Sequence, residues 1–464
     1  MVIGGDAAGM SAASQARRQR RDLEIVALEK GEWVSYSACG IPYHVAGDVD
    51  SLDDLVVRTP QELRDRLLID VRTGHEVTAL DLDARRVEVR DHRHGRSIRL
   101  GFDHLVVATG ARPRRPDLPG SDLECVQGVQ TLDDARRLLE FARGSRCEKV
   151  VVVGGGYVGL EMAEAFLRWG ARVTVVCDAP QVMPTLDPDM ASLVERAMGA
   201  LDIEVRLGTR VVGFEEGAVQ TEEGPIPADL VVLGMGVAPN SELAAEAGLE
   251  VGVGSAIRVD RRQRSSVDGV WAAGDCCESR HLVSGERVHV ALGTVANRQG
   301  RVAGVNAGGG YATFPGVLGT AVTKVCDAEV GRTGLSEREA AAAGFDVVAP
   351  RIKSSSQAGY LPGAKPLVVK VVAERGTGRL LGGQIVGREG AAKRIDVLAV
   401  AIGQGMTADQ LVDTDLSYAP PFGPLWDPLA AAARRADHMV DEADAAVHTP
   451  ETRTARPGNT SPSS

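Results

Sequence analysis

Two segments of the chain place apolar runs, glycine-rich turns and helix-like stretches in the same order. The first runs from the apolar residues 2–3 through 4-GGDAAG-9 to 24-EIVALEK-30. The second runs from four valines through 154-GGGYVG-159 to 171-ARVTVVCD-178. An apolar strand, a glycine turn, a helix and a second apolar strand make a βαβ unit. The pattern therefore predicts two βαβ units in one chain.

The remaining apolar runs predict further strands and a third domain of a different kind. The runs 104-HLVVATGARP-113 and 230-LVVLGMGVAPN-240 each predict a buried strand that ends in a glycine turn. Farther along, the strand patterns at 366–372 and 380–387 precede a helix pattern near 391–404. We therefore expect two α/β domains followed by an α+β domain.

Composition supports a multidomain protein with packed cores. The chain has 464 residues, 44% hydrophobic and 25% charged, which is long enough for about three domains. After about residue 433 it is rich in Pro, Ser, Thr and charge and lacks large apolar residues. We expect a disordered tail there.

Charge and cysteine usage exclude several classes of partner. The net charge of −11 argues against nucleic acid or an anionic membrane as the main partner. We find no apolar run of about 18–20 residues and no signal peptide pattern. The seven cysteines are odd in number and scattered, and no pair has metal-ligand spacing. We therefore expect a cytoplasmic protein without a bound metal.

The second glycine turn has the complete spacing of a dinucleotide site. Gly154, Gly156 and Gly159 permit a tight turn, close approach of a pyrophosphate and close helix–strand packing. The alternative, an incidental glycine turn, is disfavoured by the strand before it and the helix after it. At the end of the second strand, Asp178 would repel a 2′-phosphate and no basic residue follows, which favours NADH over NADPH.

The first glycine turn is incomplete. Gly4 and Gly9 hold the outer positions, but Asp6 occupies the middle one, so its carboxylate must point away from a pyrophosphate or be bridged by water. Glu29, at the end of the second strand, is placed to bond ribose hydroxyls. The turn 272-AAGD-275 offers Asp275 to a ribityl chain or a ribose, although such a turn alone is more often a plain strand end.

One cysteine stands alone in 33-WVSYSACGIPYHVAG-47. A thiol beside a flavin can form a mixed disulfide with an external thiol, or a sulfenic acid, without a partner cysteine. From its own sequence context, Cys39 is more often a structural thiol. Cys276 and Cys277 could be a redox pair, but two small buried residues are the preferred interpretation.

Together, these motifs and 291-ALGTVANRQGR-301 resemble the pyridine nucleotide–disulfide oxidoreductase family over roughly residues 1–430. The resemblance implies FAD on the first unit, a nicotinamide cofactor on the second, and a homodimer formed by the C-terminal domain. The domains expected are 1–112 (FAD, first part), 113–244 (NAD(P)), 245–312 (FAD, second part), 313–432 (dimerisation) and a tail at 433–464. The cofactor-binding residues expected are Gly4, Gly9, Glu29, Lys30, Val77, Thr109, Gly110, Gly154, Gly156, Tyr157, Gly159, Asp178, Gly236, Gly274, Asp275 and Ala291.

The segment SACGIPY resembles the single-cysteine branch of this family, which includes coenzyme A disulfide reductases, persulfide reductases and NADH oxidases. Tyr360 and Tyr418 are similar to tyrosines that reach the active site across the dimer in coenzyme A disulfide reductases. The resemblance also implies a substrate site made of Ser11, Gln15, Arg18, Ser35, Tyr43, Asn297 and Trp426. Trp426 departs from the pattern, because it stands where a basic residue would help to hold a substrate phosphate.

The resemblance implies an enzyme that passes hydride from NAD(P)H through FAD to Cys39 and reduces coenzyme A disulfide or a related small disulfide or persulfide. Tyr360 and Tyr418 would assist, Tyr157 would gate the nicotinamide pocket, and the flavin and nearby backbone donors would lower the pKa of Cys39. Two alternatives stay open. One is an NADH oxidase that reduces oxygen through a Cys39 sulfenic acid, and the other is a flavin-bound redox sensor or electron carrier.

Overall fold

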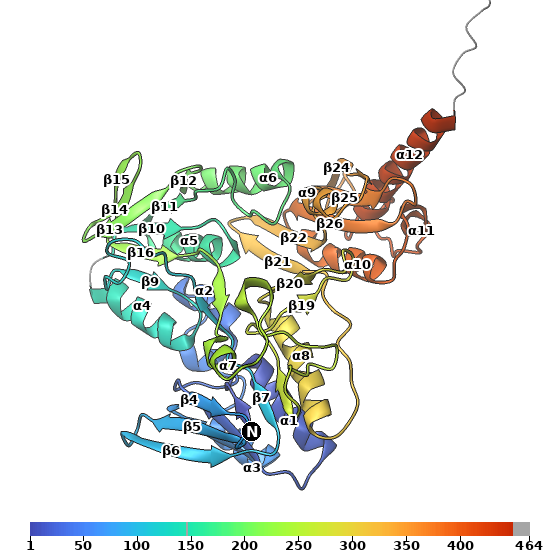
Figure 1. The fold of residues 1–464 in the computed structure, drawn as a ribbon. Coiled ribbons are helices and arrows are strands. Elements are labelled where there is room, and N and C mark those ends of the chain that lie inside the picture. The colour runs from blue at the N-terminus through green and yellow to red at the C-terminus, as the bar shows by residue number, and fades with distance from the viewer. Residues whose placement is uncertain (145–146, 449–464) are drawn as a thin grey trace, which may run out of the picture.

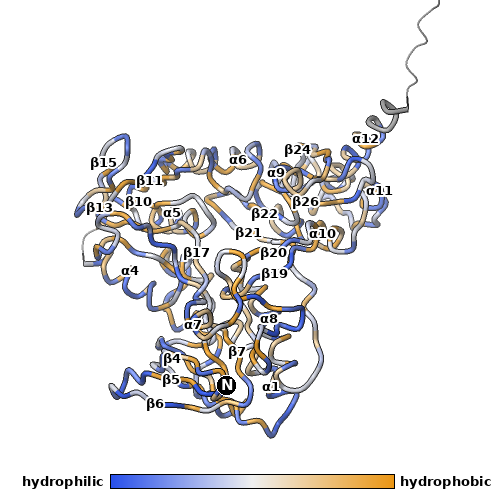
Figure 2. Tube along the Cα trace, in the orientation of Figure 1, coloured by the Kyte–Doolittle hydropathy of each residue, from blue (hydrophilic) through white to orange (hydrophobic). Residues whose placement is uncertain are grey.

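A computed structural model describes residues 1–144 and 147–448 of the chain, and side chains as far as residue 441. It shows three domains, of which two are built on parallel sheets and one on an antiparallel sheet (Figure 1). This is the α/β architecture with two Rossmann-like domains that the hydrophobic pattern predicts. Figure 2 shows apolar colour in the interior of each domain and polar colour on outer segments such as the tip at β15.

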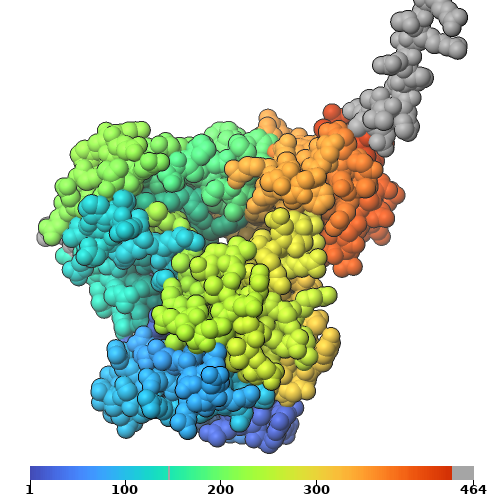
Figure 3. Space-filling view, viewed as in Figure 1, coloured from blue at the N-terminus to red at the C-terminus, as the bar shows by residue number. Residues whose placement is uncertain are grey.

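The first sheet is assembled from two separate parts of the chain. Its strands are β1 (Val2–Ile3), β2 (Ile25–Glu29), β3 (Ile69–Thr73), β7 (Leu105–Val107) and β18 (Val270–Ala272), in the order β18-β7-β1-β2-β3. All neighbouring strands are parallel. The chain therefore leaves this sheet after β7, builds the second domain, and returns to pair β18 with β7. In Figure 3 the returning segment, in yellow-green, occupies the middle of the visible face.

Two helices cover one face of this sheet. Helices α1 (Ala7–Gln19) and α8 (Gly293–Ala307) lie side by side (Figure 1). A Cβ on Gly300 or Gly304 would lie 2.2 Å from the carbonyl oxygen of Ala8 or Ala12, so only glycine permits this contact. The other face packs against an antiparallel sheet of β4 (His75–Asp81), β5 (Arg86–Asp91) and β6 (Arg96–Gly101). The short elements η1 (Ala38–Gly40), α2 (Ile41–Val45), η2 (Leu52–Leu55) and α3 (Pro60–Leu67) lie between β2 and β3 in the chain.

The second domain repeats the parallel arrangement. Its strands are β9 (Val126–Gly128), β10 (Lys149–Val153), β11 (Arg172–Val176), β12 (Glu204–Arg206) and β16 (Leu230–Leu233), in the order β12-β11-β10-β16-β9. One face packs on α4 (Leu132–Gly144), α5 (Tyr157–Trp169) and α6 (Pro188–Gly199), and the other on β13 (Val211–Glu215), β14 (Ala218–Thr221) and β15 (Gly224–Pro227). Buried valines of β10 face both cores, which explains why four consecutive positions of this strand, 150–153, are apolar.

Two short strands join the first two domains. β8 (Ala111–Pro113) pairs antiparallel with β17 (Val237–Pro239), so the two predicted glycine turns lie next to each other. Asn240 reinforces this junction, because its backbone N–H donates to Gly110 O at 2.9 Å and its side chain donates to Thr109 O at 2.9 Å. Helix α7 (Glu242–Glu246), η3 (Val253–Ser255) and the pair β19 (Ser279–Arg280) and β20 (Arg287–Val288) complete the returning segment.

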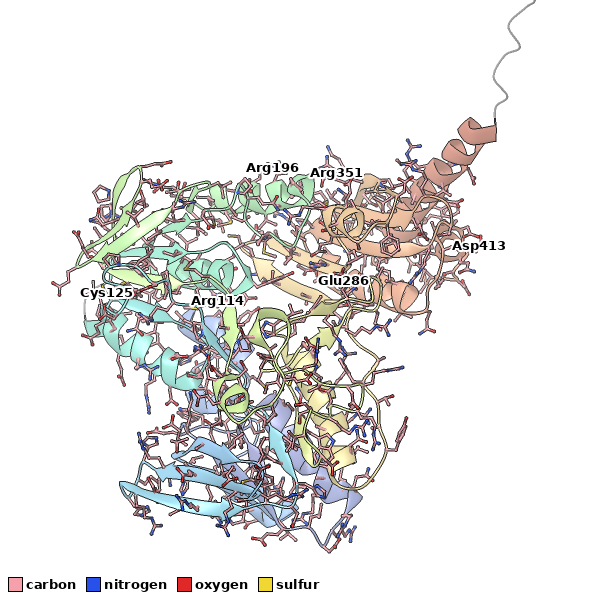
Figure 4. All side chains as sticks on the ribbon, in the orientation of Figure 1. Arg114, Cys125, Arg196, Glu286, Arg351 and Asp413 are labelled. Carbon is pink, nitrogen blue, oxygen red and sulfur yellow. The ribbon has the colours of Figure 1, made fainter. Side chains whose placement is uncertain are left out.

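The third domain is a six-stranded sheet covered by helices. Its strands are β21 (Ala321–Val325), β22 (Ala328–Gly334), β23 (Val347–Val348), β24 (Arg351–Ser355), β25 (Pro366–Glu374) and β26 (Leu380–Gly387). Its helices are α9 (Glu337–Ala342), α10 (Ala391–Gly403), α11 (Ala408–Val412) and α12 (Pro428–His448). Arg351 ties it to the second domain, because Nη1 donates to Asp189 O of α6 at 2.9 Å (Figure 4). Within the described residues, no helix is long and apolar enough to span a membrane.

The expectation of a disordered tail from residue 433 is wrong for residues 433–448. These residues continue α12, and the side chains of Ala432, Ala433, Ala436 and Val440 are buried against the third domain. Small alanines favour a helix and allow it to approach the sheet closely, so large apolar residues are not needed. Residues 449–464 of the predicted tail lie outside the described part of the chain.

Helix α12 should contribute measurably to the stability of the third domain. Leu429 is 1% exposed, so we expect Leu429→Ala to lower the free energy of unfolding by about 2–5 kcal/mol. Arg435→Ala, at an exposed position of the same helix, should change it by less than about 0.5 kcal/mol. Urea unfolding followed by circular dichroism measures both, and equal effects would show that α12 is not part of the core.

Candidate active site

The carboxyl ends of the parallel strands gather the predicted nucleotide-binding residues at one edge of each sheet. In the first domain, Gly4 follows β1, Lys30 follows β2, Thr109 and Gly110 follow β7, and Asp275 follows β18. In the second domain, Gly154 follows β10, Asp178 follows β11 and Gly236 follows β16. Crevices outside the carboxyl ends of parallel strands are where α/β sheets bind ligands. Val77 lies on β4 and Ala291 just before α8.

Both glycine turns need glycine at the same two places. Gly4 and Gly154 have φ of +107° and +109°. A Cβ on Gly9 would lie 2.0 Å from Gly4 O, and one on Gly159 would lie 2.3 Å from Gly154 O. Gly9 and Gly159 therefore allow each helix to begin in direct contact with the backbone of the turn before it. Helices α1 and α5 thus present free backbone N–H groups at the ends of β1 and β10.

Glu29, at the end of the neighbouring strand β2, hydrogen-bonds to the first glycine turn. Its carboxylate accepts hydrogen bonds from the backbone N–H groups of Gly5 and Gly31, both at 2.7 Å. Burial nevertheless raises the pKa of Glu29, because these two bonds offset only part of the lost hydration. The carboxylate is held rigidly at the strand end, which is the position predicted for a contact with ribose hydroxyls.

Asp6 turns its carboxylate toward the segment that carries Cys39. Oδ1 accepts from the backbone N–H of Tyr36 at 3.1 Å. Burial raises the pKa of Asp6 to about 6, and the nearby carboxylates of Glu29 and Asp275 also raise it. A group with that pKa is partly protonated near neutral pH, which reduces its repulsion of a bound anion.

Asp275 has a buried oxygen atom without a partner. Its Oδ1 is enclosed and, among the described residues, accepts no hydrogen bond, while burial raises the pKa of the group to about 6. An enclosed carboxylate oxygen without a donor is costly, so it indicates a donor that the protein itself does not supply. Sugar or ribityl hydroxyls are such donors. Asp275, Glu29 and the first glycine turn therefore fit FAD.

Cys39 lies in η1, immediately before α2. Solvent reaches this residue, and all seven cysteines are free thiols. Protein atoms surround the sulfur closely enough that partial burial raises its pKa, and Glu161, Asp275 and Asp6 add to the effect. The expected lowering of this pKa depends on bound flavin and on backbone donors. In the chain alone, a backbone hydrogen bond lowers the pKa of Cys39, but burial and the three carboxylates outweigh it.

A groove of about 540 Å³ opens beside the Cys39 segment. It contains five of the seven predicted substrate residues, namely Ser11, Gln15, Arg18, Ser35 and Asn297. Ser11 Oγ donates to Asn297 Oδ1 at 2.6 Å, which joins α1 to α8 in the lining of the groove. Ser37, two residues before Cys39, also lines it. The groove therefore borders the segment that carries Cys39, although Cys39 is not one of its lining residues.

The other predicted substrate residues lie elsewhere in this chain. Tyr43 lines a separate cavity of about 30 Å³ with Glu161 and Lys324. Trp426 is half exposed on the third domain, where the guanidinium carbon of Arg434 lies 4.7 Å from its ring centre. An arginine of α12 therefore brings positive charge to the place where the sequence lacks a basic residue.

The two predicted catalytic tyrosines lie together on the third domain. Tyr360 is 74% and Tyr418 46% exposed, and desolvation together with the neighbouring Tyr360 hydroxyl raises the pKa of Tyr418. Tyr157 begins α5, and its hydroxyl lies 3.3 Å from Thr185 Oγ1. Burial raises the pKa of Tyr157. Cys276 and Cys277 are fully buried with sulfur atoms 3.7 Å apart, as expected for small packed residues.

Sequence reasoning missed three arginines and one glutamate. Arg58, Arg298 and Arg301 line the groove together with Arg18. Asn297 and Arg301 are four residues apart on α8, so they lie on one helix face. Because Asn297 was predicted to bind substrate, this spacing could have indicated Arg301 as well. Glu161 of α5 influences Cys39 although 122 residues separate them, and no local pattern reveals such a pair.

These observations define an oxidoreductase class: two dinucleotide-binding domains meet around an accessible thiol. The chain belongs to the pyridine nucleotide-disulphide oxidoreductase family. That family's model matches residues 1–300, and the model of its dimerisation domain matches residues 320–428.

Two similar proteins and one solved structure match this chain over most of its length. The chain is 40% identical to an NAD(P)H sulfur oxidoreductase (CoA-dependent) of Pyrococcus abyssi, over 94% of this chain and 97% of that protein. It is 38% identical to an NADH oxidase of Methanocaldococcus jannaschii, over 94% and 98% of the two chains. The solved structure of an NAD-dependent persulfide reductase from A. fulgidus matches with a TM-score of 0.92 and 40% identity, over 95% of this chain and 83% of that one.

The unpartnered oxygen of Asp275 gives a direct test of the flavin site. Replacing Asp275 by Leu removes an acceptor for hydroxyl donors, and we expect FAD to bind about tenfold or more weakly. Titration of flavin-free protein with FAD, followed by fluorescence, measures the Kd. Asp268→Leu, at an exposed position before β18, is the matched control. An unchanged Kd in Asp275→Leu would remove this residue from the site.

Proposed function

We propose that the protein is an NAD(P)H-dependent reductase of coenzyme A disulfide, or of a related small disulfide or persulfide, with FAD as cofactor and Cys39 as the reacting thiol. The observation that carries this proposal is the groove beside the segment that holds Cys39. Four arginines line it, although the chain as a whole has a net charge of −11. Such a concentration of guanidinium groups suits a substrate with several phosphates.

Cys39 supplies the covalent step. Its thiolate attacks one sulfur of the incoming disulfide, so that a Cys39–S–S–CoA bond forms, the substrate S–S bond breaks, and one CoA thiolate leaves. Bound FAD would supply the chemistry that transfers two electrons from NADH to this mixed disulfide. Reduction frees the second CoA and restores the Cys39 thiolate. The balance is one NADH, one proton and one disulfide consumed, with one NAD⁺ and two thiols formed.

The residues around Cys39 control its protonation. Glu161, Asp275 and Asp6 oppose formation of the thiolate in the chain alone. Burial raises the pKa of Asp6 and of Asp275 to about 6. When either carboxylate is protonated, its repulsion of a Cys39 thiolate is lost. Cys39 is exposed beside the groove, so an external disulfide can reach it, whereas a fully buried thiol such as Cys276 is not accessible.

A homodimer completes the site in this proposal. The match to a dimerisation domain supports association through the third domain. Tyr360 and Tyr418 are exposed on that domain and lie beside each other, so a second subunit can use them. There their hydroxyls orient the substrate disulfide and donate a hydrogen bond to the departing thiolate.

The choice of nicotinamide cofactor rests on Asp178. It is exposed at the end of β11, where a carboxylate repels a 2′-phosphate, so we propose NADH as the preferred donor. Tyr157, at the start of α5, covers the nicotinamide pocket in this proposal. A cytoplasmic location stays a prediction from the composition.

An NADH oxidase is the second candidate, because a relative with 38% identity over 94% of this chain carries that name. In this case Cys39 would cycle through a sulfenic acid, and NADH loss would be matched by oxygen consumption. In the reductase, NADH loss is matched by release of two thiols. A redox sensor or electron carrier would show a stable reduced flavin and negligible turnover with any disulfide.

Replacing Cys39 by Ser tests the thiol. We expect Cys39→Ser to lose essentially all NADH-dependent reduction of coenzyme A disulfide while it keeps bound FAD, because serine cannot form the mixed disulfide. Thiol release and flavin content measure the two properties. Cys125→Ser, at a partly exposed position of the second domain, is the control (Figure 4). Retained turnover in Cys39→Ser would exclude the proposed chemistry.

The groove arginines should determine the preference for the phosphorylated end of the substrate. We expect Arg298→Gln combined with Arg301→Gln to raise KM for coenzyme A disulfide about tenfold or more, with little change in kcat. KM for pantethine, a disulfide without the nucleotide, should not change. Arg66→Gln, an exposed arginine of α3 outside the groove, is the control. A parallel rise for both disulfides would contradict recognition of the phosphates.

A further inference from the structure

The loops that carry Tyr360 and Tyr418 form one unit. The backbone N–H of Ala358 donates to Pro420 O at 2.9 Å, which joins the loop between β24 and β25 to the loop between α11 and α12. Both tyrosines project into solvent, with 74% and 46% of their surface exposed. Side chains with so little packing are positioned by their backbone, so whatever fixes the two loops also fixes the two hydroxyls.

Arg394 of α10 connects both loops. Its Nη2 donates to Phe422 O at 2.6 Å and to Ser356 O at 3.3 Å, and its Nη1 donates to Gly390 O at 2.6 Å. Its buried Nε lies 3.7 Å from Asp427 Oδ2. One guanidinium therefore contacts the start of its own helix and both tyrosine-bearing loops, and its side chain is only 14% exposed.

The helix beneath this guanidinium is a rigid base. Ile395 and Leu398 of α10 are fully buried, and the backbone N–H of Ala392 donates to Glu329 Oε2 at 2.8 Å. A planar guanidinium offers five N–H donors in a fixed geometry, whereas an ammonium group is a point charge on a flexible chain. Lysine at this position would keep the charge but could not hold both loop carbonyls in the same way.

We propose that Arg394 is a positioning residue for the reduction of the disulfide: it sets the place of Tyr360 and Tyr418 and does not itself touch the substrate. This inference rests on the proposed function, because it acts through the two tyrosines. It assigns Arg394 to the step in which the disulfide is attacked and its thiolate leaves. Reduction of the enzyme by NADH, which uses the other two domains, should be independent of Arg394.

Stopped-flow measurement of the two half-reactions of the FAD-loaded dimer tests this assignment. We expect Arg394→Met to slow reoxidation of the reduced enzyme by coenzyme A disulfide about 10- to 100-fold, as a misplacement near 1 Å does. The rate of reduction by NADH should stay within twofold of the parent. Arg394→Lys should recover part of the lost rate. Arg388→Met, which removes an exposed ion pair with Asp327 at 3.3 Å in the same domain, should match the parent.

A second comparison separates a positioning role from general damage. In a Tyr360→Phe, Tyr418→Phe enzyme the hydroxyls are gone, so adding Arg394→Met should slow reoxidation by less than twofold more. If Arg394→Met slows this enzyme by the same factor as it slows the parent, Arg394 acts independently of the tyrosines and the inference is wrong. Equal slowing of both half-reactions would also overturn it.

The results distinguish failure of this inference from failure of the proposed function. Parental reoxidation in Arg394→Met, with slow reoxidation in the double tyrosine variant, overturns the inference and leaves the tyrosine roles intact. Parental reoxidation in the double tyrosine variant overturns the tyrosine roles and the inference together. Reoxidation of Cys39→Ser by coenzyme A disulfide would overturn the proposed function itself.

Discussion

The site depends on the return of the chain to its first sheet. β18 pairs with β7 after the whole second domain has been built, and this pairing brings Asp275 to the edge that already holds the first glycine turn and Glu29. The backbones of α1 and α8 lie in close contact, which only glycine permits at Gly300 and Gly304. This contact holds the returning segment against the first domain. Without this closure, neither the proposed flavin contacts nor the groove between the two helices would exist.

Acidic and basic side chains are distributed differently around the thiol and the groove. Carboxylates of Asp6, Glu161 and Asp275 raise the pKa of Cys39, while four arginines and one of these carboxylates, Asp6, line the groove beside it. The arginines suit an anionic substrate, and the carboxylates oppose accumulation of an idle thiolate in the chain alone. The four arginines explain how an acidic protein can offer a predominantly basic substrate groove.

Much of the fold was predictable because glycine turns and apolar strands are local signals. The two βαβ units, the strands at 366–372 and 380–387 and the helix near 391–404 are confirmed as β25, β26 and α10. The helix at residues 433–448 was mispredicted as a disordered tail because its buried side chains are mostly alanines. Composition alone does not distinguish such a helix from a polar segment without structure. The pKa of Cys39 could not be predicted, because its neighbours Glu161 and Asp275 come from distant parts of the chain. The same holds for Arg394, whose contacts lie in two loops on either side of it in the sequence.

The most direct test of the account is the chemical state of Cys39 after reaction with the proposed substrate. The NADH-reduced enzyme is mixed anaerobically with coenzyme A disulfide, quenched with acid, digested and analysed by mass spectrometry. The account predicts one coenzyme A bound through a disulfide to the peptide that contains Cys39, and its loss when NADH is added before the quench. A Cys39 peptide without the adduct, or an adduct on another of the seven cysteines, would contradict the account.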